Sequence, residues 1–119
     1  MGLMKVNVLV KPSREHKKQL LVDFIIDSGA VYSLVPAADL IKIGLKPYKK
    51  VKFSLVDGTT ILREVGDAYF EYLGEGGAAP VIFGEDGDEP LLGATTLESM
   101  GLMLNPFKRE LIPMRMLLA

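Results

Sequence analysis

An acidic residue followed by two small residues stands at the end of an apolar run in the first third of the chain. In the stretch "DFIIDSGAVYSLVP" (residues 23–36), Asp27 follows directly on apolar residues 24–26. Such a run is typical of a buried strand, where a carboxylate is costly unless it has a partner. Gly29 permits a turn that brings a backbone N–H to the carboxylate, and Ser28 offers a hydroxyl to hold it in plane. The pattern predicts a buried carboxylate that is held by neighbouring groups.

Two interpretations of Asp27 are open at this point. The first is an Asx-turn, in which the side chain merely caps a loop. The second is acid–base catalysis, and the rest of the composition limits which kind. The chain has no cysteine, which excludes thiolate nucleophiles, thiolate metal sites and disulfides. Its single His16 lies in a polar run, so a Ser-His-Asp triad has no candidate base. Hydrolytic chemistry would have to use carboxylates.

Length and charge indicate an ordinary globular protein. The 119 residues fit one domain, residues 1–119, with 49% hydrophobic and 24% charged residues and a net charge of −1. This balance favours neither nucleic acid nor an anionic membrane as a partner, and the basic stretches at 14–18 and 46–50 are interpreted as solvated loops. No apolar run reaches the ~20 residues that span a bilayer, and no secretory signal is visible. We expect a cytoplasmic protein.

The first half of the chain alternates in the manner of strands. Residues 5–10 and 20–26 predict two strands of a long hairpin, and residues 36–44, from Pro36 to a glycine stop, predict one short helix. The clearest hairpin signal is 51–65, where two apolar runs flank Asp57-Gly58.

The second half continues the pattern. A further strand is expected at 66–74, a glycine-rich turn at 74–80 that breaks it, and a new strand from 81. An acidic turn at 85–90 precedes a strand that feeds a short helix, with Thr95 or Thr96 as its cap, and the chain ends in a hairpin-like piece or terminal strand marked by Pro106 and Pro113. The pattern of six to eight short strands and two short helices predicts an all-β barrel or sandwich that carries two short helices.

Two other stretches have compositions that resemble a calcium-binding loop and a phosphate-binding loop. The acidic residues 84–89 lack the loop length and the terminal bidentate Glu of a calcium loop. The glycines at 74–80 lack the Lys-Ser/Thr of a phosphate loop. We therefore expect no metal and no cofactor.

The motifs together resemble the retropepsin-like (clan AA) aspartic proteases, in the family's order over residues 5–113. "LVDFIIDSGAVYSLVP" is similar to the active-site strand and loop, with Asp27-Ser28-Gly29 on the Asp-Ser/Thr-Gly motif and Ala30 on its small fourth residue. "FSLVDGTTI" stands where the family has the flap hairpin, and "EPLLGATTLESMGL" resembles the segment and helix packed behind the active-site loop. "LIKIGL" and "FSLVDGTTI" are most similar to the small prokaryotic branch.

The resemblance implies a closed barrel or sandwich of the acid-protease fold and an acid–base mechanism. Two aspartates share a proton and activate one water, because like charges at close range cannot both ionise. The chain has a single Asp-Ser/Thr-Gly. One chain therefore holds half a site, and a symmetric homodimer would bring Asp27 of each copy to the axis, oriented by Ser28. The terminal strands "KVNVLV" and "ELIPMRMLLA" are the expected interface, and the alternative for the C-terminal one is that it folds onto the core of its own chain.

The resemblance also predicts where a peptide or protein substrate would bind. Contacts are expected from Ala30 and from the hairpin tip, and an apolar wall from neighbouring side chains. The tip differs from viral relatives because it has one glycine beside polar residues, which predicts a stiffer and more polar flap. The tip residues are Val56, Asp57, Gly58 and Thr59, and the wall residues are Val31, Val56, Ile61, Ile82 and Leu92.

Three functions remain open from the sequence. The first is a homodimeric aspartic endopeptidase with Asp27, Ser28 and Gly29 as its catalytic motif. The second is a non-catalytic dimeric module of the same fold that binds peptides or a protein. The third is a small β-barrel in which Asp27 forms an incidental turn.

Overall fold

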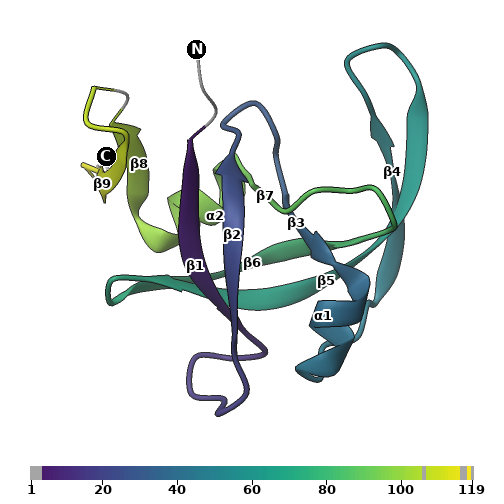
Figure 1. Cartoon of the computed structure of the whole chain (residues 1–119), viewed down its shortest axis with the longest axis horizontal. Helices are drawn as coiled ribbons and strands as arrows, with labels where there is room; N and C mark the ends of the chain where they lie inside the picture. Colours follow the sequence, from purple (N-terminus) through teal and green to yellow (C-terminus); the bar gives the residue numbers. More distant parts are fainter. Residues whose placement is uncertain (1–3, 106, 116–117, 119) are drawn as a thin grey trace.

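A computed structural model describes residues 4–105, 107–115 and 118, and strands make up most of its regular structure (Figure 1). Two short helices interrupt them. In chain order the elements are β1 (Lys5–Lys11), β2 (Leu20–Ile26), β3 (Ser33–Pro36), α1 (Ala37–Lys42), β4 (Lys49–Ser54), β5 (Thr60–Tyr72), β6 (Glu75–Gly84), β7 (Leu91–Leu92), α2 (Ala94–Met100), β8 (Leu102–Asn105) and β9 (Glu110–Pro113). The predicted all-β class is confirmed.

Most strands of the described chain belong to one sheet of order β1-β2-β7-β3-β6-β5-β4. β2 pairs with β7 and β3 with β6 in parallel, and the remaining pairs are antiparallel. β1 also pairs with β5 over Leu9–Lys11, which folds the sheet back toward its own first strand. The strands enclose a core whose largest fully buried side chains include Phe24 and Phe70, from β2 and β5, with ring centroids 6.3 Å apart.

The expected hairpins are present, with two differences in their bounds. β5 is one strand of 13 residues, so the separate strand predicted at 66–74 is its second half. The glycine-rich segment 74–80 is not a turn that ends a strand, because β6 starts at Glu75 and runs through it. The turn itself falls at Leu73 and Gly74, both with positive φ.

Close packing explains why glycines occur inside β6. A Cβ at Gly76 would collide with the Tyr69 ring and hydroxyl, and a Cβ at Gly77 would collide with the Ser99 carbonyl at the end of α2. Glycine lets β6 approach its neighbours at these two positions. The glycine-rich composition of this segment resembles that of a loop, but in β6 the glycines are required by close packing.

Both predicted helices form, and they are short. α1 begins after Pro36 and is followed by Gly44 at φ 96, as expected of a helix with a glycine stop. The predicted threonine cap of α2 is wrong, because Gly93 occupies the N-cap position without a side-chain bond. Thr96 is fully buried in the first turn and uses its hydroxyl elsewhere.

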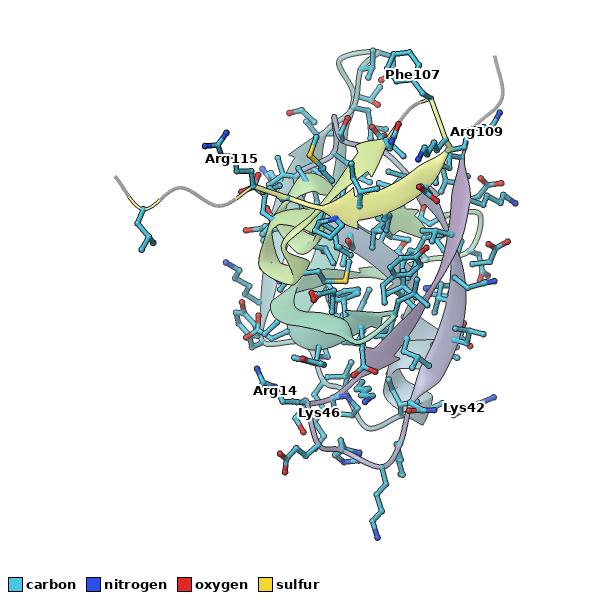
Figure 2. All side chains as sticks on the ribbon, turned by 90° about the vertical axis from the view of Figure 1, so that its left-hand side faces the viewer. Arg14, Lys42, Lys46, Phe107, Arg109 and Arg115 are labelled. Carbon is cyan, nitrogen blue, oxygen red and sulfur yellow. The ribbon has the colours of Figure 1, made fainter. Side chains whose placement is uncertain are left out.

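β8 and β9 form a two-stranded sheet of their own beside α2, as the hairpin-like prediction for the C-terminal region required. Phe107 in their turn is exposed, whereas Arg14, Lys42 and Lys46 lie at the opposite end of the molecule (Figure 2). Pro106, one of the two prolines expected to mark this region, lies outside the described residues, and Pro113 ends β9. No helix among the described residues is long and apolar enough to cross a membrane.

Candidate active site

Asp27 is the first residue after β2, and its backbone is fixed by neighbouring strands. Its N–H donates to the carbonyl of Leu92 (3.0 Å), and two residues earlier the N–H of Ile25 donates to the carbonyl of Pro90 (3.2 Å). The carboxylate Oδ1 accepts from the Gly29 N–H (2.9 Å), and the Asp27 carbonyl accepts from the Ala30 N–H (3.1 Å). The tight turn expected after Asp27 is present, with the carboxylate held against it.

The expectation that Asp27 is buried is wrong for the single chain. Residues 27–29 are exposed, although Ile26 just before them is buried. The reason is local: the strand ends at Ile26, and the turn carries the next three residues out of the sheet. Burial of this carboxylate would require another surface to cover it.

Ser28 does not orient the carboxylate within the chain. Among the described residues, no hydrogen bond involves its hydroxyl, and Gly29 supplies the bond that Ser28 was expected to make. Ser28 instead lines a shallow groove of about 180 Å³ with residues of α2 and β8, including Leu97, Met103 and Leu104. Ser28 therefore lies on the side of the loop that faces α2 and β8.

The loop that follows Asp27 rests on the start of α2. The N–H groups of Ala94 and Thr95 donate to the carbonyls of Ala30 (2.8 Å) and Val31 (3.0 Å). A Cβ at Gly93 would lie 2.6 Å from the Tyr32 carbonyl oxygen, so the two segments meet too closely for a side chain. This contact is the structural reason for the glycine in "LLGATT".

A buried polar pair lies behind this contact. Ser33 and Thr96 are both fully buried, and their hydroxyl oxygens are 2.5 Å apart. The Ser33 hydroxyl also accepts from the Gly93 N–H (2.9 Å). Each polar group has a partner, which is what a buried position demands.

A cleft of about 410 Å³ opens between the loop that follows Asp27 and the β4–β5 hairpin. Leu34, Ile82 and Leu91, which are neighbours in the sheet, contribute to its lining. The full lining is Gly29, Ala30, Val31, Tyr32, Leu34, Lys52, Phe53, Ser54, Leu55, Ile61, Arg63, Ile82 and Leu91. The cleft is mostly apolar and begins beside the Asp27 turn, so an extended chain with apolar side chains would suit it.

Some of the predicted substrate contacts line the cleft and others do not. Ala30 and the predicted wall residues Val31, Ile61 and Ile82 line the cleft, whereas Leu92 is fully buried in the core. The tip residues Val56, Asp57, Gly58 and Thr59 are exposed and lie beyond the cleft lining of the single chain.

The tip is ordered by Asp57. Its Oδ1 accepts from the N–H (3.0 Å) and the hydroxyl (2.7 Å) of Thr59, and Gly58 follows at φ 89. The Thr59 hydroxyl, with help from the Thr59 N–H, lowers the pKa of the Asp57 carboxyl. The tip thus carries a stable negative charge on a defined turn, in line with the predicted polar tip.

Side chains of the hairpin contact the body of the protein through Phe53 and Arg63. The Tyr32 and Phe53 rings meet edge to face across the cleft, with centroids 6.1 Å apart. Arg63 is paired with Asp88 through two bonds, from Nε to Oδ2 (2.8 Å) and from Nη2 to Oδ1 (3.2 Å). The Arg63 guanidinium lowers the pKa of the Asp88 carboxyl, and the bond from that carboxyl raises the pKa of Arg63.

Several residues of this site were absent from the sequence prediction. Tyr32, Phe53 and Arg63 were not assigned roles, and neither was the pair Ser33–Thr96. Phe53, Ile61 and Arg63 are half-buried and alternate with exposed residues, and this two-residue period of the strands marks one face of the hairpin. Ser33 carried a weaker signal, as a polar residue at an inward position of the strand "SLVP".

Comparison with known proteins relates this geometry to one fold. No protein-family model matches the chain, and no curated protein sequence matches it. Among solved structures, the solution structure of the simian foamy virus (mac) protease matches with a TM-score of 0.54 and 20% sequence identity, covering 79% of this chain and 91% of that chain. The chain therefore has the retropepsin-like fold of that viral protease.

Proposed function

We propose that this chain is one subunit of a homodimeric aspartic endopeptidase. The observation that carries the proposal is the position of Asp27: its carboxylate is held by Gly29 at the end of β2, exposed, beside the apolar cleft. An exposed carboxylate in a rigid turn suits a residue that meets a second copy. The fold shared with a viral protease supports this assignment.

In the proposed dimer, the Asp27 carboxylates of two copies share one proton across the axis. The ionised carboxylate takes a proton from a water molecule, whose oxygen attacks the carbonyl carbon of the peptide, while the protonated carboxyl donates to the carbonyl oxygen. Transfer of a proton to the leaving nitrogen then breaks the C–N bond. The Gly29 N–H keeps the Asp27 carboxylate in place during these steps.

The surface best suited to the second copy lies around β8 and β9. These strands form a separate two-stranded sheet, and a sheet this small gains stability from further packing. Met103, 44% exposed, faces the half-buried Ile112 across the ladder. β1 is a weaker candidate than expected, because it already pairs with β2 and, over Leu9–Lys11, with β5. Within the predicted interface segment 110–119, residues 116, 117 and 119 lie outside the described residues.

The test is cleavage of a mixed peptide library between about pH 3 and 7 by the protein and its Asp27→Asn variant. We expect cleavage by the protein, with a bell-shaped pH profile, and none by Asp27→Asn. Asp23→Asn is the matched control, since Asp23 is an exposed aspartate of β2 outside the cleft, and it should cleave normally. Equal cleavage by the protein and Asp27→Asn would refute the proposal.

The alternative is a dimeric module of the same fold that binds peptides without cleaving them. The polar, ordered tip at Asp57 and Thr59 is the feature that favours it. Peptide binding in the same library, unaffected by Asp27→Asn and without products, would support this function.

A further inference from the structure

Arg63 stands where the β4–β5 hairpin (residues 49–63) extends beyond the edge of β6. From Glu64 to Tyr72, β5 pairs with β6, but residues 60–63 pair only with β4. Arg63 is thus the first residue of the hairpin beyond the β5–β6 ladder. In Figure 1 the hairpin extends away from the body of the protein on the side opposite β8 and β9.

The hairpin has no core of its own. Between Leu45 and Val65, which are both buried, no residue of the chain is fully buried. Segments with few buried contacts open locally at a low free-energy cost. The orientation of the hairpin over the cleft therefore depends on a small number of side-chain contacts at its base and along its inner face.

The contact at the base is an ion pair of defined geometry. Arg63 and Asp88 form two parallel bonds, and their side chains are only 14% and 20% exposed. A bidentate pair of this kind fixes direction as well as distance. The Asp88 carboxylate also accepts from the Glu85 N–H (2.9 Å), and the Asp88 N–H donates to the Glu85 carbonyl (3.0 Å). Asp88 is thereby held rigidly within its own turn.

That turn continues into the strand that supports Asp27. Two residues after Asp88, the Pro90 carbonyl accepts from Ile25, and the Leu92 carbonyl accepts from Asp27. The ion pair thus joins the base of the hairpin to the segment that fixes the active-site turn.

Each nitrogen of the Arg63 guanidinium makes a contact within the chain. Nε and Nη2 bond to Asp88, while Nη1 bonds to the Leu62 carbonyl (3.0 Å) and lies 3.4 Å from a Glu85 oxygen. Although Arg63 lines the cleft, its charge is balanced by these carboxylates. Its position indicates a structural link between two walls of the cleft.

We propose that Arg63 and Asp88 are a positioning pair that fixes the base of the β4–β5 hairpin and sets its orientation over the cleft for peptide binding. The part of this inference that concerns catalysis rests on the proposed peptidase function. The part that concerns the order of the hairpin does not.

The first test is amide hydrogen exchange of the full chain without ligand. In Asp88→Asn, amides of residues 52–62 should exchange about tenfold faster, while those of the β1–β2 ladder keep their rates. Arg63→Lys keeps the charge but loses the bidentate geometry, so it should show a smaller increase. Glu85→Gln is the control, because the Glu85 carboxylate is 65% exposed and pairs with Arg63 at 3.4 Å, and it should leave the hairpin unchanged. Unchanged hairpin rates in Asp88→Asn, or an equal increase throughout the chain, would overturn the proposal.

The second test is cleavage of the peptide that the library identifies as the best substrate. A displaced hairpin weakens peptide binding, so Asp88→Asn should raise KM about fivefold or more with kcat within about twofold. A variant that merely loses folded protein would lower kcat at constant KM, and that result would overturn the positioning role. If neither the protein nor its variants cleave peptides, the peptidase proposal fails while the exchange rates still decide the role of the pair.

Discussion

The backbone N–H of Gly93 donates to the hydroxyl of Ser33, which is buried 60 residues earlier in the chain (2.9 Å). The same hydroxyl lies 2.5 Å from that of Thr96. Through these bonds β3 holds the β7–α2 junction against the loop that follows Asp27. The junction and the loop also meet through backbone bonds such as that of Ala94 with Ala30.

Ser33→Ala should lower the free energy of unfolding by about 1–3 kcal/mol, because it leaves the buried Gly93 N–H and the Thr96 hydroxyl without this partner. Thr96→Val should have a smaller effect in the same direction. Thr95→Val is the matched control, since its hydroxyl makes no bond among the described residues, and it should change stability by less than about 0.5 kcal/mol. Urea unfolding measures all three. Equal effects of Thr95→Val and Thr96→Val would contradict the role of the pair.

Gly93→Ala should destabilise the protein by about 1–3 kcal/mol through overpacking. Its Cβ would lie 2.6 Å from the Tyr32 carbonyl oxygen and 3.0 Å from that of Ala30, so backbone would have to move. Gly29→Ala is the comparison, because its Cβ would lie 3.2 Å from a side-chain oxygen of Asp27, which can shift. Thermal unfolding should show a clearly lower midpoint for Gly93→Ala than for Gly29→Ala, and the reverse order would contradict this account.

The stability that the Arg63–Asp88 pair provides should depend on pH. The pKa of the Asp88 carboxyl is lowered from 3.8, chiefly by its bond from Arg63. Since the folded pKa lies below the unfolded one, the stabilisation is complete above the unfolded value and is lost as pH falls through the folded value. Lys50, Glu64 and Glu85 line a pocket beside the same guanidinium.

Asp88→Asn should therefore cost about 1–3 kcal/mol of unfolding free energy near pH 7 and progressively less below the ordinary pKa of 3.8. Denaturant unfolding of the protein and the variant between about pH 2.5 and 7 gives the difference. Glu85→Gln, which removes an exposed and more distant charge, should cost less than about 0.5 kcal/mol at each pH. A difference for Asp88→Asn that does not shrink on acidification would exclude the ion pair as its source.

Local signals were sufficient to predict much of this fold. β2 and its end before Asp27 follow from an apolar run and a turn, and the β4–β5 hairpin follows from Asp57-Gly58 between two such runs. Contacts across the fold were not predictable in this way. Ser33 and Thr96 are 63 residues apart, and Arg63 and Asp88 are 25 apart, so no local pattern identifies the partners.

The errors have the same origin. The glycines of β6 have the composition of a turn, but they are required by contacts with Tyr69 and Ser99, which a local pattern does not reveal. Asp27 was expected to be buried because the run before it is apolar, yet the turn carries it to the surface. Whether a residue at the end of a strand is covered depends on what packs there, and in this chain nothing among the described residues covers Asp27.

If each site needs Asp27 from two copies, mixing the protein with Asp27→Asn should inhibit it more than dilution alone. With free exchange of subunits, only dimers of two unsubstituted chains are active, so an equal mixture at constant total concentration should retain about a quarter of the activity. A monomeric enzyme would retain about half. Mixing with Asp23→Asn, which keeps Asp27, should leave the activity unchanged. Peptide cleavage followed until the mixture reaches a constant rate distinguishes these cases, and retention of half the activity would exclude the shared site.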